Sequence, residues 1–307
     1  MIEARKLTKK YGEKLATDDL TFGVEPGKVT GFLGPNGAGK STTMRMMVGL
    51  DRPSSGSVVI NGSSYADHVA PLHEVGALLE ASAVHPGRSA RNHLLALALT
   101  SGIGKARVEL VLDMVGLTEV AGKRVSGFSL GMGQRLGVAA ALLGDPHTLI
   151  LDEPVNGLDL DGIRWIRALL RHLAGEGRTV FLSSHLMSEM AVTADHVIVV
   201  GKGRLLRDQS MSDFIGDAAA DSVRVLSANQ ERLAERLRGA GASVTVGTAS
   251  TDGLPLLVAD LSSREIGTQA AAAGITLWEL SPQAGSLEDA YLALTRDSLD
   301  YQDGEVA

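Results

Sequence analysis

The sequence predicts an α/β chain with a core of parallel strands, an inserted helical subdomain and a small α+β domain after the core. Three observations predict this class. Short apolar strands alternate with helical stretches up to about residue 207, helix formers dominate residues 71–144, and the order of elements changes after about residue 216. A chain of 307 residues is long enough for one large domain and a smaller one. We expect domains at 1–216, with the helical subdomain at about 71–144, and at 217–307.

The composition limits the function classes. The chain has 44% hydrophobic and 21% charged residues, which is ordinary for a globular protein. Its net charge of −7 argues against a nucleic-acid partner, because phosphate backbones require a concentrated basic surface. The absence of cysteine excludes disulfides, thiolate catalysis and cysteine-ligated metal centres.

No stretch reaches the ~18–20 continuous apolar residues that a membrane helix needs. The run His93–Thr100 is the most apolar, and its length suits a buried helix. The start, Met1–Arg5, lacks the apolar centre of a secretory signal. We therefore expect a cytoplasmic protein.

The core elements follow from apolar runs and turn residues. Strands are predicted at Leu20–Val24 and Val29–Leu33, a helix begins at Lys40 and stops at Gly49, and a strand follows at Ser57–Ile60. After the helical subdomain, the pattern predicts a doubly wound parallel sheet from strands Thr148–Leu151, Thr179–Ser183 and His196–Val200, with a helix at Gly162–Leu173.

The last part of the chain has the element order β-α-β-β-α-β, which predicts a small ferredoxin-like domain. Its expected elements are Val223–Leu226, Gln230–Arg238, Ser243–Val246, Leu254–Asp260, Ser263–Ala273 and Ile275–Leu280. A helix at Ser286–Thr295 and a polar acidic tail are expected to follow.

A glycine-rich segment between the strand Val29–Leu33 and the following helix satisfies the P-loop pattern. It reads Gly34-Pro35-Asn36-Gly37-Ala38-Gly39-Lys40-Ser41, and Thr42 continues it. Glycines let backbone N–H groups surround phosphates, and the helix N-terminus adds positive potential. Lys40 is expected to meet the β/γ oxygens of ATP and Ser41 to bind Mg²⁺. The segment predicts a P-loop ATPase core.

Two carboxylates, Asp152 and Glu153, end the apolar strand Thr148–Leu151. Phosphoryl transfer requires charge neutralisation and an oriented nucleophile. We expect Asp152 to hold Mg²⁺ and Glu153 to polarise the attacking water. A kinase, a GTPase and other P-loop ATPases would share these features.

Three further segments distinguish among these classes. They are Phe128-Ser129-Leu130-Gly131-Met132-Gly133-Gln134-Arg135, Asn156-Gly157-Leu158-Asp159 and Ser183-Ser184-His185. In this order they resemble the signature, aspartate and histidine motifs of ABC transporter ATPases, although Leu130 and Met132 replace small or polar residues of the fullest signature. The resemblance covers about residues 2–207.

The resemblance implies roles for these segments. Ser129 and Gly131 would face the γ-phosphate held by a second subunit, at a helix N-terminus that favours anions. Asp159 would lie at the subunit boundary, and His185 would contact the γ-phosphate and the water held by Glu153. A histidine that only caps a helix is the alternative for His185.

Two further residues depend on the resemblance. Tyr11 resembles the aromatic residue that stacks on adenine, with a plain surface tyrosine as the alternative. Glu80 stands where the family usually has glutamine. It retains an oxygen ligand for Mg²⁺ or water, and the alternative is a solvated loop acid.

The resemblance also implies partners. Two such subunits, either a homodimer or a pair with a related chain, would sandwich two ATP molecules and act on a separate membrane permease. The segment Ser286–Thr295 looks like the closing helix of many bacterial drug- and polysaccharide-type exporter ATPases, so export is expected. The rivals are a P-loop kinase and a non-transport regulator, and the cargo is a guess at an antibiotic or a lipid-linked molecule.

Overall fold

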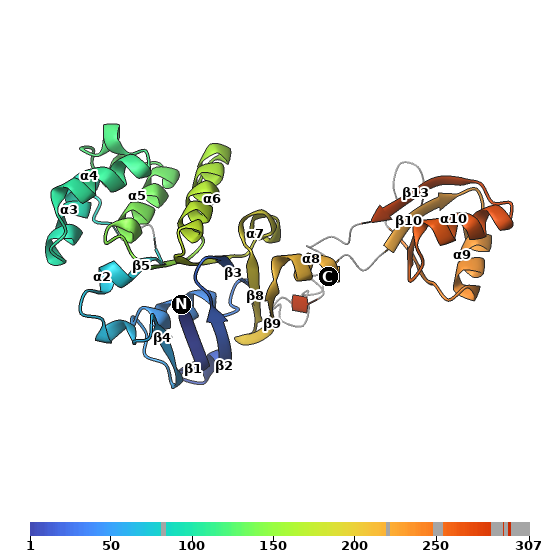
Figure 1. Cartoon of the computed structure of the whole chain (residues 1–307), viewed down its shortest axis with the longest axis horizontal. Coiled ribbons are helices and arrows are strands. Elements are labelled where there is room, and N and C mark those ends of the chain that lie inside the picture. Colours follow the sequence, from blue (N-terminus) through green and yellow to red (C-terminus); the bar gives the residue numbers. More distant parts are fainter. Residues whose placement is uncertain (81–83, 219–221, 248–253, 284–290, 292–293, 296–307) are drawn as a thin grey trace, which may run out of the picture. The chain divides into compact units, whose positions relative to one another are not determined.

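The computed structural model describes residues 1–80, 84–218, 222–247, 254–283, 291 and 294–295 (Figure 1). It divides the chain into two compact units, residues 1–211 with 295–307, and Ser212–Leu294. The functional domain bounds given above, 1–216 and 217–307, stay a prediction. Among the described helices, none combines the length and the apolar character that a membrane crossing requires.

The first unit contains a three-stranded antiparallel sheet in the order β2-β1-β4. It is formed by β1 (Ile2–Tyr11), β2 (Lys14–Val24) and β4 (Ser55–Ile60). The sequence pattern missed β1, because register shifts against both neighbours break its alternation of buried and exposed residues. Tyr11 is the last residue of β1.

A six-stranded sheet forms the centre of this unit, in the order β5-β6-β7-β3-β8-β9. Its strands are β5 (Val75–Leu78), β6 (Thr148–Leu151), β7 (Thr179–Ser184), β3 (Val29–Leu33), β8 (His196–Gly201) and β9 (Arg204–Ser210). The first five are parallel, and β9 is antiparallel to β8. The sheet is therefore mixed, and not wholly parallel as expected.

The two sheets pack face to face. The ring centroid of Phe22 of β2 lies 5.5 Å from that of Phe32 of β3 and 6.0 Å from that of Phe181 of β7, and the latter two lie 5.2 Å apart. The preceding residue of β3, Gly31, faces the other side of the sheet, because a Cβ built on it would lie 2.5 Å from Met190 Sδ of α7 (Met187–Thr193). Strand β3 is thus buried on both faces, which explains its continuous apolar run.

Helices pack against both sheets of this unit. The helix α1 (Lys40–Met47) contacts β2 and β4, and α6 (Leu160–Gly175) contacts β7 and β3. The inserted helices between β5 and β6 are α3 (Ala90–Thr100), α4 (Lys105–Met114) and α5 (Leu130–Leu142). The short α2 (Pro71–Glu74) leads into β5. The expectation of a helical subdomain from residue 71 was wrong for Val75–Leu78, because a short apolar run does not distinguish a strand from a helix.

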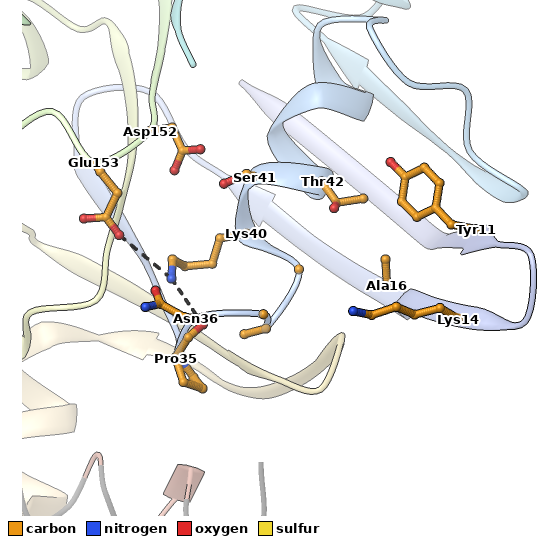
Figure 2. A pocket seen from close by; sticks show the side chains of 13 residues that line it. Tyr11, Lys14, Ala16, Pro35, Asn36, Lys40, Ser41, Thr42, Asp152 and Glu153 are labelled. Carbon is orange, nitrogen blue, oxygen red and sulfur yellow. Dashed lines mark hydrogen bonds and ion pairs between the residues drawn. The ribbon is translucent and has the colours of Figure 1, made fainter. Parts of the chain in front are cut away.

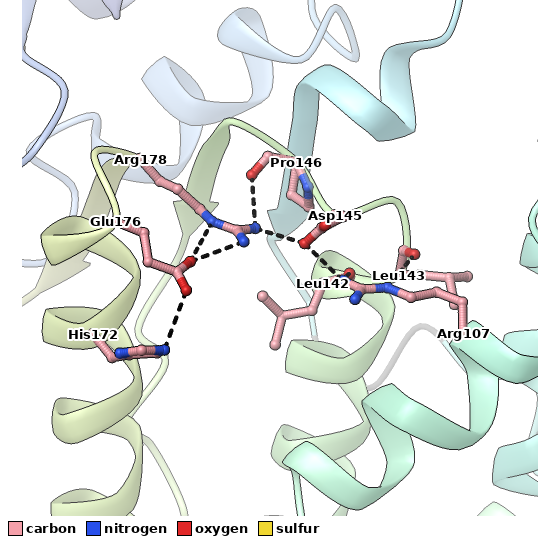
Figure 3. Close-up of polar contacts among 8 residues, drawn as sticks. All are labelled: Arg107, Leu142, Leu143, Asp145, Pro146, His172, Glu176 and Arg178. Atoms are coloured by element: carbon pink, nitrogen blue, oxygen red, sulfur yellow. Dashed lines mark hydrogen bonds and ion pairs between the residues drawn. The ribbon is translucent and has the colours of Figure 1, made fainter.

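An ionic cluster ties the inserted helices to the central sheet (Figure 3). Arg107 of α4 donates to the Leu142 carbonyl at 2.7 Å and to Asp145 Oδ1 at 3.0 Å. The same oxygen of Asp145 accepts from Arg178 at 2.9 Å, just before β7. Asp145 therefore joins the end of the insertion to the loop that follows α6.

The second unit begins with residues of α8 (Met211–Ala218) and continues in the order β-α-β-β-α-β. Its elements are β10 (Ser222–Ser227), α9 (Gln230–Gly239), β11 (Ser243–Val246), β12 (Leu256–Ala259), α10 (Ser263–Ala272) and β13 (Leu277–Gln283). The strands form one antiparallel sheet in the order β11-β12-β10-β13. Most of the expected helix Ser286–Thr295 and the tail after it lie outside the described residues.

Candidate functional site

The segment Gly34–Gly39 connects β3 directly to α1, as the sequence pattern predicts. Gly37 and Gly39 have φ angles of 82° and 96°, a region that residues with side chains rarely adopt. A Cβ on Gly39 would also lie 2.5 Å from the Ala16 carbonyl oxygen, so only glycine fits there. The segment closes around an open hollow of about 360 Å³ (Figure 2), which is lined by Tyr11, Lys14, Ala16, Pro35, Asn36, Gly37, Ala38, Gly39, Lys40, Ser41, Thr42, Asp152 and Glu153.

Lys40 brings a nearly buried ammonium group to this hollow, with 7% of the residue exposed. Its Nζ donates to the Gly34 carbonyl at 2.7 Å and lies 3.9 Å from Glu153 Oε1. Burial lowers the pKa of Lys40, and the charges of Glu153 and Asp152 oppose that effect. A partly desolvated cation of this kind attracts an anionic ligand more strongly than an exposed one.

The two carboxylates lie at the end of β6 and are fixed by neighbouring elements. Ser183 of β7 donates its hydroxyl to Asp152 Oδ1 and accepts from the Glu153 backbone N–H at 2.9 Å. Gln134 of α5 donates to the Glu153 carbonyl at 3.1 Å. Glu153 has a φ of 49°, a strained conformation that surrounding contacts must hold. The quoted motifs contain Ser183 and Gln134, but their spacing did not reveal these two roles.

His185 follows β7 and places its ring beside Glu153. Its Nδ1 lies 2.9 Å from Glu153 Oε2. The N-cap of α7 is Leu186, not His185. The ring therefore contacts the carboxylate at the hollow, which is the geometry expected of a residue that acts with Glu153.

Ser129 and Asp159 are both helix N-caps. Ser129 accepts from the Met132 N–H at 3.2 Å at the start of α5, and Asp159 accepts from the Gly162 N–H at 2.8 Å at the start of α6. The loop just before α6 packs closely against the first residue of α5. A Cβ built on Gly157 in that loop would lie 2.3 Å from Leu130 Cγ. Ser129, Gly131 and Asp159 are not among the residues that line the hollow. One chain thus presents two separate features that attract anions, the hollow at Lys40 and the helix start at Ser129.

Tyr11 lines the hollow at the end away from Asp152 and Glu153 (Figure 2). Its hydroxyl donates to Asp51 Oδ2 at 2.9 Å. Sequence reasoning missed Asp51, because a polar residue in an exposed turn carries no periodic signal. Glu80 lies two residues after β5 and is not among the lining residues, although its charge acts on Arg45.

The described residues include no group of three or more His, Cys, Asp or Glu side chains that could enclose a metal ion. Ser41 and Asp152 both line the hollow. This donor set suits Mg²⁺, which is usually held by one or two carboxylates together with phosphate oxygens and water.

Comparisons with known proteins agree with this geometry. The family described as ABC transporter matches residues 17–156, and a domain of unknown function matches residues 220–288. An uncharacterized ABC transporter ATP-binding protein of Bacillus subtilis (strain 168) is 36% identical over 97% of both chains. The bacitracin transport ATP-binding protein BcrA of Bacillus licheniformis is 44% identical over 68% of this chain and 69% of its own.

A solved structure shows the same fold. It is the dimeric structure of a post-hydrolysis state of the ATP-binding cassette MJ0796 bound to ADP and Pi. It is 25% identical, has a TM-score of 0.62 and covers 69% of this chain and 99% of its own. The family match at residues 17–156 contains the P-loop, Asp152, Glu153 and the Ser129 helix start.

Proposed function

The chain belongs to the ABC transporter family as an ATP-binding subunit, and from this premise we propose that two copies close head to tail around two ATP molecules. Family members bind and hydrolyse ATP to drive transport through a separate permease. The observation that carries the proposal is the separation of the Lys40 hollow from the Ser129 helix start within one chain. A second copy would bring its own Ser129 to the γ-phosphate, and the dimeric neighbour with ADP and Pi supports this arrangement.

We infer the following roles in ATP binding. The backbone of Gly34–Gly39 and the side chain of Lys40 would hold the phosphates, with Thr42 beside them. Ser129 and Gly131 of the second copy would hold the γ-phosphate from the opposite side, with Asp159 at the boundary. The hollow extends from Asp152 and Glu153 to Tyr11, whose ring would stack on adenine.

Hydrolysis would depend on the pair formed by Glu153 and His185. Glu153 would orient a water molecule and accept its proton, while His185 would hold the carboxylate in place. Ser41 and Asp152 are the residues that would hold Mg²⁺, with Glu80 as a further ligand from the loop after β5. When bound, this ion would neutralise negative charge on the phosphate oxygens. The charge of the separated products would then favour reopening of the dimer.

We also propose that the chain binds a separate membrane permease at the cytoplasmic face of the membrane. The contact surface would lie at residues 80–91, of which 81–83 lie outside the described residues. Ser89, the N-cap of α3, is a suitable position for a cysteine crosslink to the permease. The similarity to BcrA supports export of an antibiotic-type cargo. We also propose that the second unit is a ferredoxin-like domain, which its element order and strand order support.

A mixing experiment tests the head-to-tail arrangement. Lys40→Ala disables the phosphate cradle and Ser129→Arg blocks the helix start, so each variant alone should release almost no phosphate. A mixed dimer keeps one complete site, so an equal mixture should recover about a quarter of the wild-type rate, since half of random dimers are mixed. No recovery above the separate variants would contradict two shared sites. Transfer of phosphate to an acceptor other than water would favour the alternative that the chain is a P-loop kinase.

A further inference from the structure

The Tyr11 ring is held by contacts at its hydroxyl. Asp51 Oδ2 accepts from the Tyr11 hydroxyl at 2.9 Å and from Arg45 Nε at 2.7 Å. Tyr11 is 46% exposed, whereas the side chain of Asp51 is only 18% exposed. A half-exposed aromatic ring at the edge of a hollow would ordinarily sample several rotamers. Here a charged acceptor, itself fixed by an arginine, restrains it.

A second contact occupies the ring itself. Lys9 Nζ lies 4.8 Å from the centroid of the Tyr11 ring and donates to the Arg52 carbonyl at 2.7 Å. The ammonium group is therefore anchored over one face of the ring, where the π electrons attract a cation. An adenine base that stacks on Tyr11 would use the other face.

Both anchors belong to the turn that follows α1. Asp51 and Arg52 follow the three residues after α1 (residues 48–50), and the backbone N–H groups of Leu50 and Asp51 donate to the Arg45 carbonyl at 2.9 and 3.3 Å. The first residue of the same helix is Lys40. Eight helical residues span about 12 Å, so one short rigid element separates the phosphate cradle from the anchors of the ring.

We propose that Asp51 is a positioning residue for the nucleotide base, which fixes the Tyr11 ring at a set distance from the phosphate cradle. The inference rests on the proposed stacking of adenine on Tyr11. Asp51 touches no reacting atom and acts only through the tyrosine. Its consequence is specific, because base binding should depend on Asp51 and phosphate binding should not.

The protonation states fit this role. The hydrogen bond from Arg45 lowers the pKa of Asp51, which keeps the carboxylate charged near neutral pH. Burial and the bond to Asp51 raise the pKa of Tyr11, so its hydroxyl remains a donor. The hydrogen bond to Asp51, together with the charges of Asp51 and Glu80, raises the pKa of Arg45, which stays a cation.

The test compares the affinities of ADP and inorganic pyrophosphate for the full chain by calorimetry. Both ligands carry a diphosphate group, and only ADP carries the base. Stacking of a base on an aromatic side chain corresponds to roughly 5- to 150-fold in affinity, and we expect Tyr11→Ala to weaken ADP at least about 5-fold. Asp51→Ala and Tyr11→Phe should each weaken ADP by about 3- to 10-fold, the effect of losing one typical hydrogen bond. Pyrophosphate affinity should stay within about twofold.

The double variant Tyr11→Ala with Asp51→Ala should bind ADP no more weakly than Tyr11→Ala alone. Glu109→Ala is the matched control, because it removes the carboxylate partner of Arg91, another exposed arginine on a helix, at 2.7 Å. Glu109→Ala should change neither the affinity for ADP nor that for pyrophosphate. Thermal unfolding of each variant reports whether the fold is kept, and Tyr11→Phe tests the hydroxyl contact with the smallest change.

The outcomes distinguish the stacking of adenine on Tyr11 from the positioning role of Asp51. If Tyr11→Ala leaves ADP affinity unchanged, adenine does not stack on Tyr11 and both the stacking and the positioning fail. If Tyr11→Ala weakens ADP but Asp51→Ala and Tyr11→Phe do not, stacking stands and the positioning role is overturned. The positioning role also fails if Asp51→Ala weakens pyrophosphate as much as ADP.

Discussion

Glu153 and His185 form a direct pair, with Oε2 of the glutamate 2.9 Å from Nδ1 of the histidine. They come from loops after β6 and β7, which pair in parallel with Leu151 opposite Leu182. The carboxyl ends of these strands therefore meet at one edge of the sheet, beside Lys40. The pair joins a carboxylate that can accept a proton to a ring that holds it in one orientation.

His185→Gln should slow hydrolysis while leaving ATP binding nearly intact. The loss in kcat should be about 10²- to 10³-fold, typical of a group that supports general base catalysis. The KM for ATP should change by no more than a few-fold, since Lys40 and the P-loop backbone remain. Steady-state phosphate release measures both values.

The control for this prediction is His172→Gln. His172 also faces a carboxylate, with Nε2 3.3 Å from Glu176 Oε1, but neither residue lines the hollow. Its kcat should equal that of the wild type. Equal losses for the two variants would argue against a catalytic role of the Glu153 and His185 pair.

Gly39→Ala should destabilise the chain more than Gly27→Ala. Both glycines have positive φ angles, 96° and 77°, so alanine costs about 1–2 kcal/mol at either position. A Cβ at residue 27 meets no atom within 4 Å, whereas at residue 39 it lies 2.5 Å from a backbone carbonyl. We expect a total loss of about 3 kcal/mol or more for Gly39→Ala. Denaturant unfolding measures the free energy of unfolding of both variants. Equal losses would show that the P-loop accommodates the added Cβ at little cost.

Asp145→Asn should reduce stability near neutral pH but not in acid. Burial raises the pKa of Asp145, but the contacts with Arg178 and Arg107 outweigh it and leave the pKa below its ordinary value. A carboxylate with a lowered pKa stabilises the fold above its unfolded pKa of about 3.9. That contribution disappears as the pH falls through the folded pKa. Because the side chain is 57% exposed, we expect a difference below about 1 kcal/mol.

The measurement is the unfolding free energy of wild type and Asp145→Asn between pH 7 and pH 2. Asparagine tolerates the φ of 55° at this position, so the backbone is retained. The control Asp161→Asn removes a carboxylate that is 87% exposed and 3.3 Å from Arg164. It should show no pH-dependent difference. A gap between wild type and Asp145→Asn that persists below pH 3 would exclude the ionic origin.

The P-loop and the strand before it were predictable because their constraints are local. Val29–Leu33 is a continuous apolar run, and Gly37 and Gly39 adopt φ angles that favour glycine. β1 was missed because its register shifts hide the alternation on which strand prediction depends. β5 was missed because its neighbour β6 follows some 70 residues later, across the inserted helices.

The sequence predicted site residues that belong to a contiguous motif. It did not predict contacts between residues that are distant in the sequence. The resemblance to ABC transporter ATPases implied that His185 contacts the water held by Glu153, and in the structure His185 Nδ1 lies 2.9 Å from Glu153 Oε2. The contacts of Ser183 and Gln134 with Glu153, and of Asp51 with Tyr11, depend on loop geometry that no spacing rule encodes. The roles proposed for the site residues, including Glu80 and the Ser129 helix start, stay predictions.

The most direct test of the account is the oligomeric state of Glu153→Gln with Mg²⁺ and ATP, measured by light scattering together with phosphate release. Glutamine keeps the size of the side chain but cannot accept the proton of the attacking water. We predict that the variant binds ATP, scarcely hydrolyses it and accumulates as a dimer, while the wild type turns over and returns to monomer. A variant that hydrolyses ATP at the wild-type rate, or stays monomeric with ATP bound, would contradict the account.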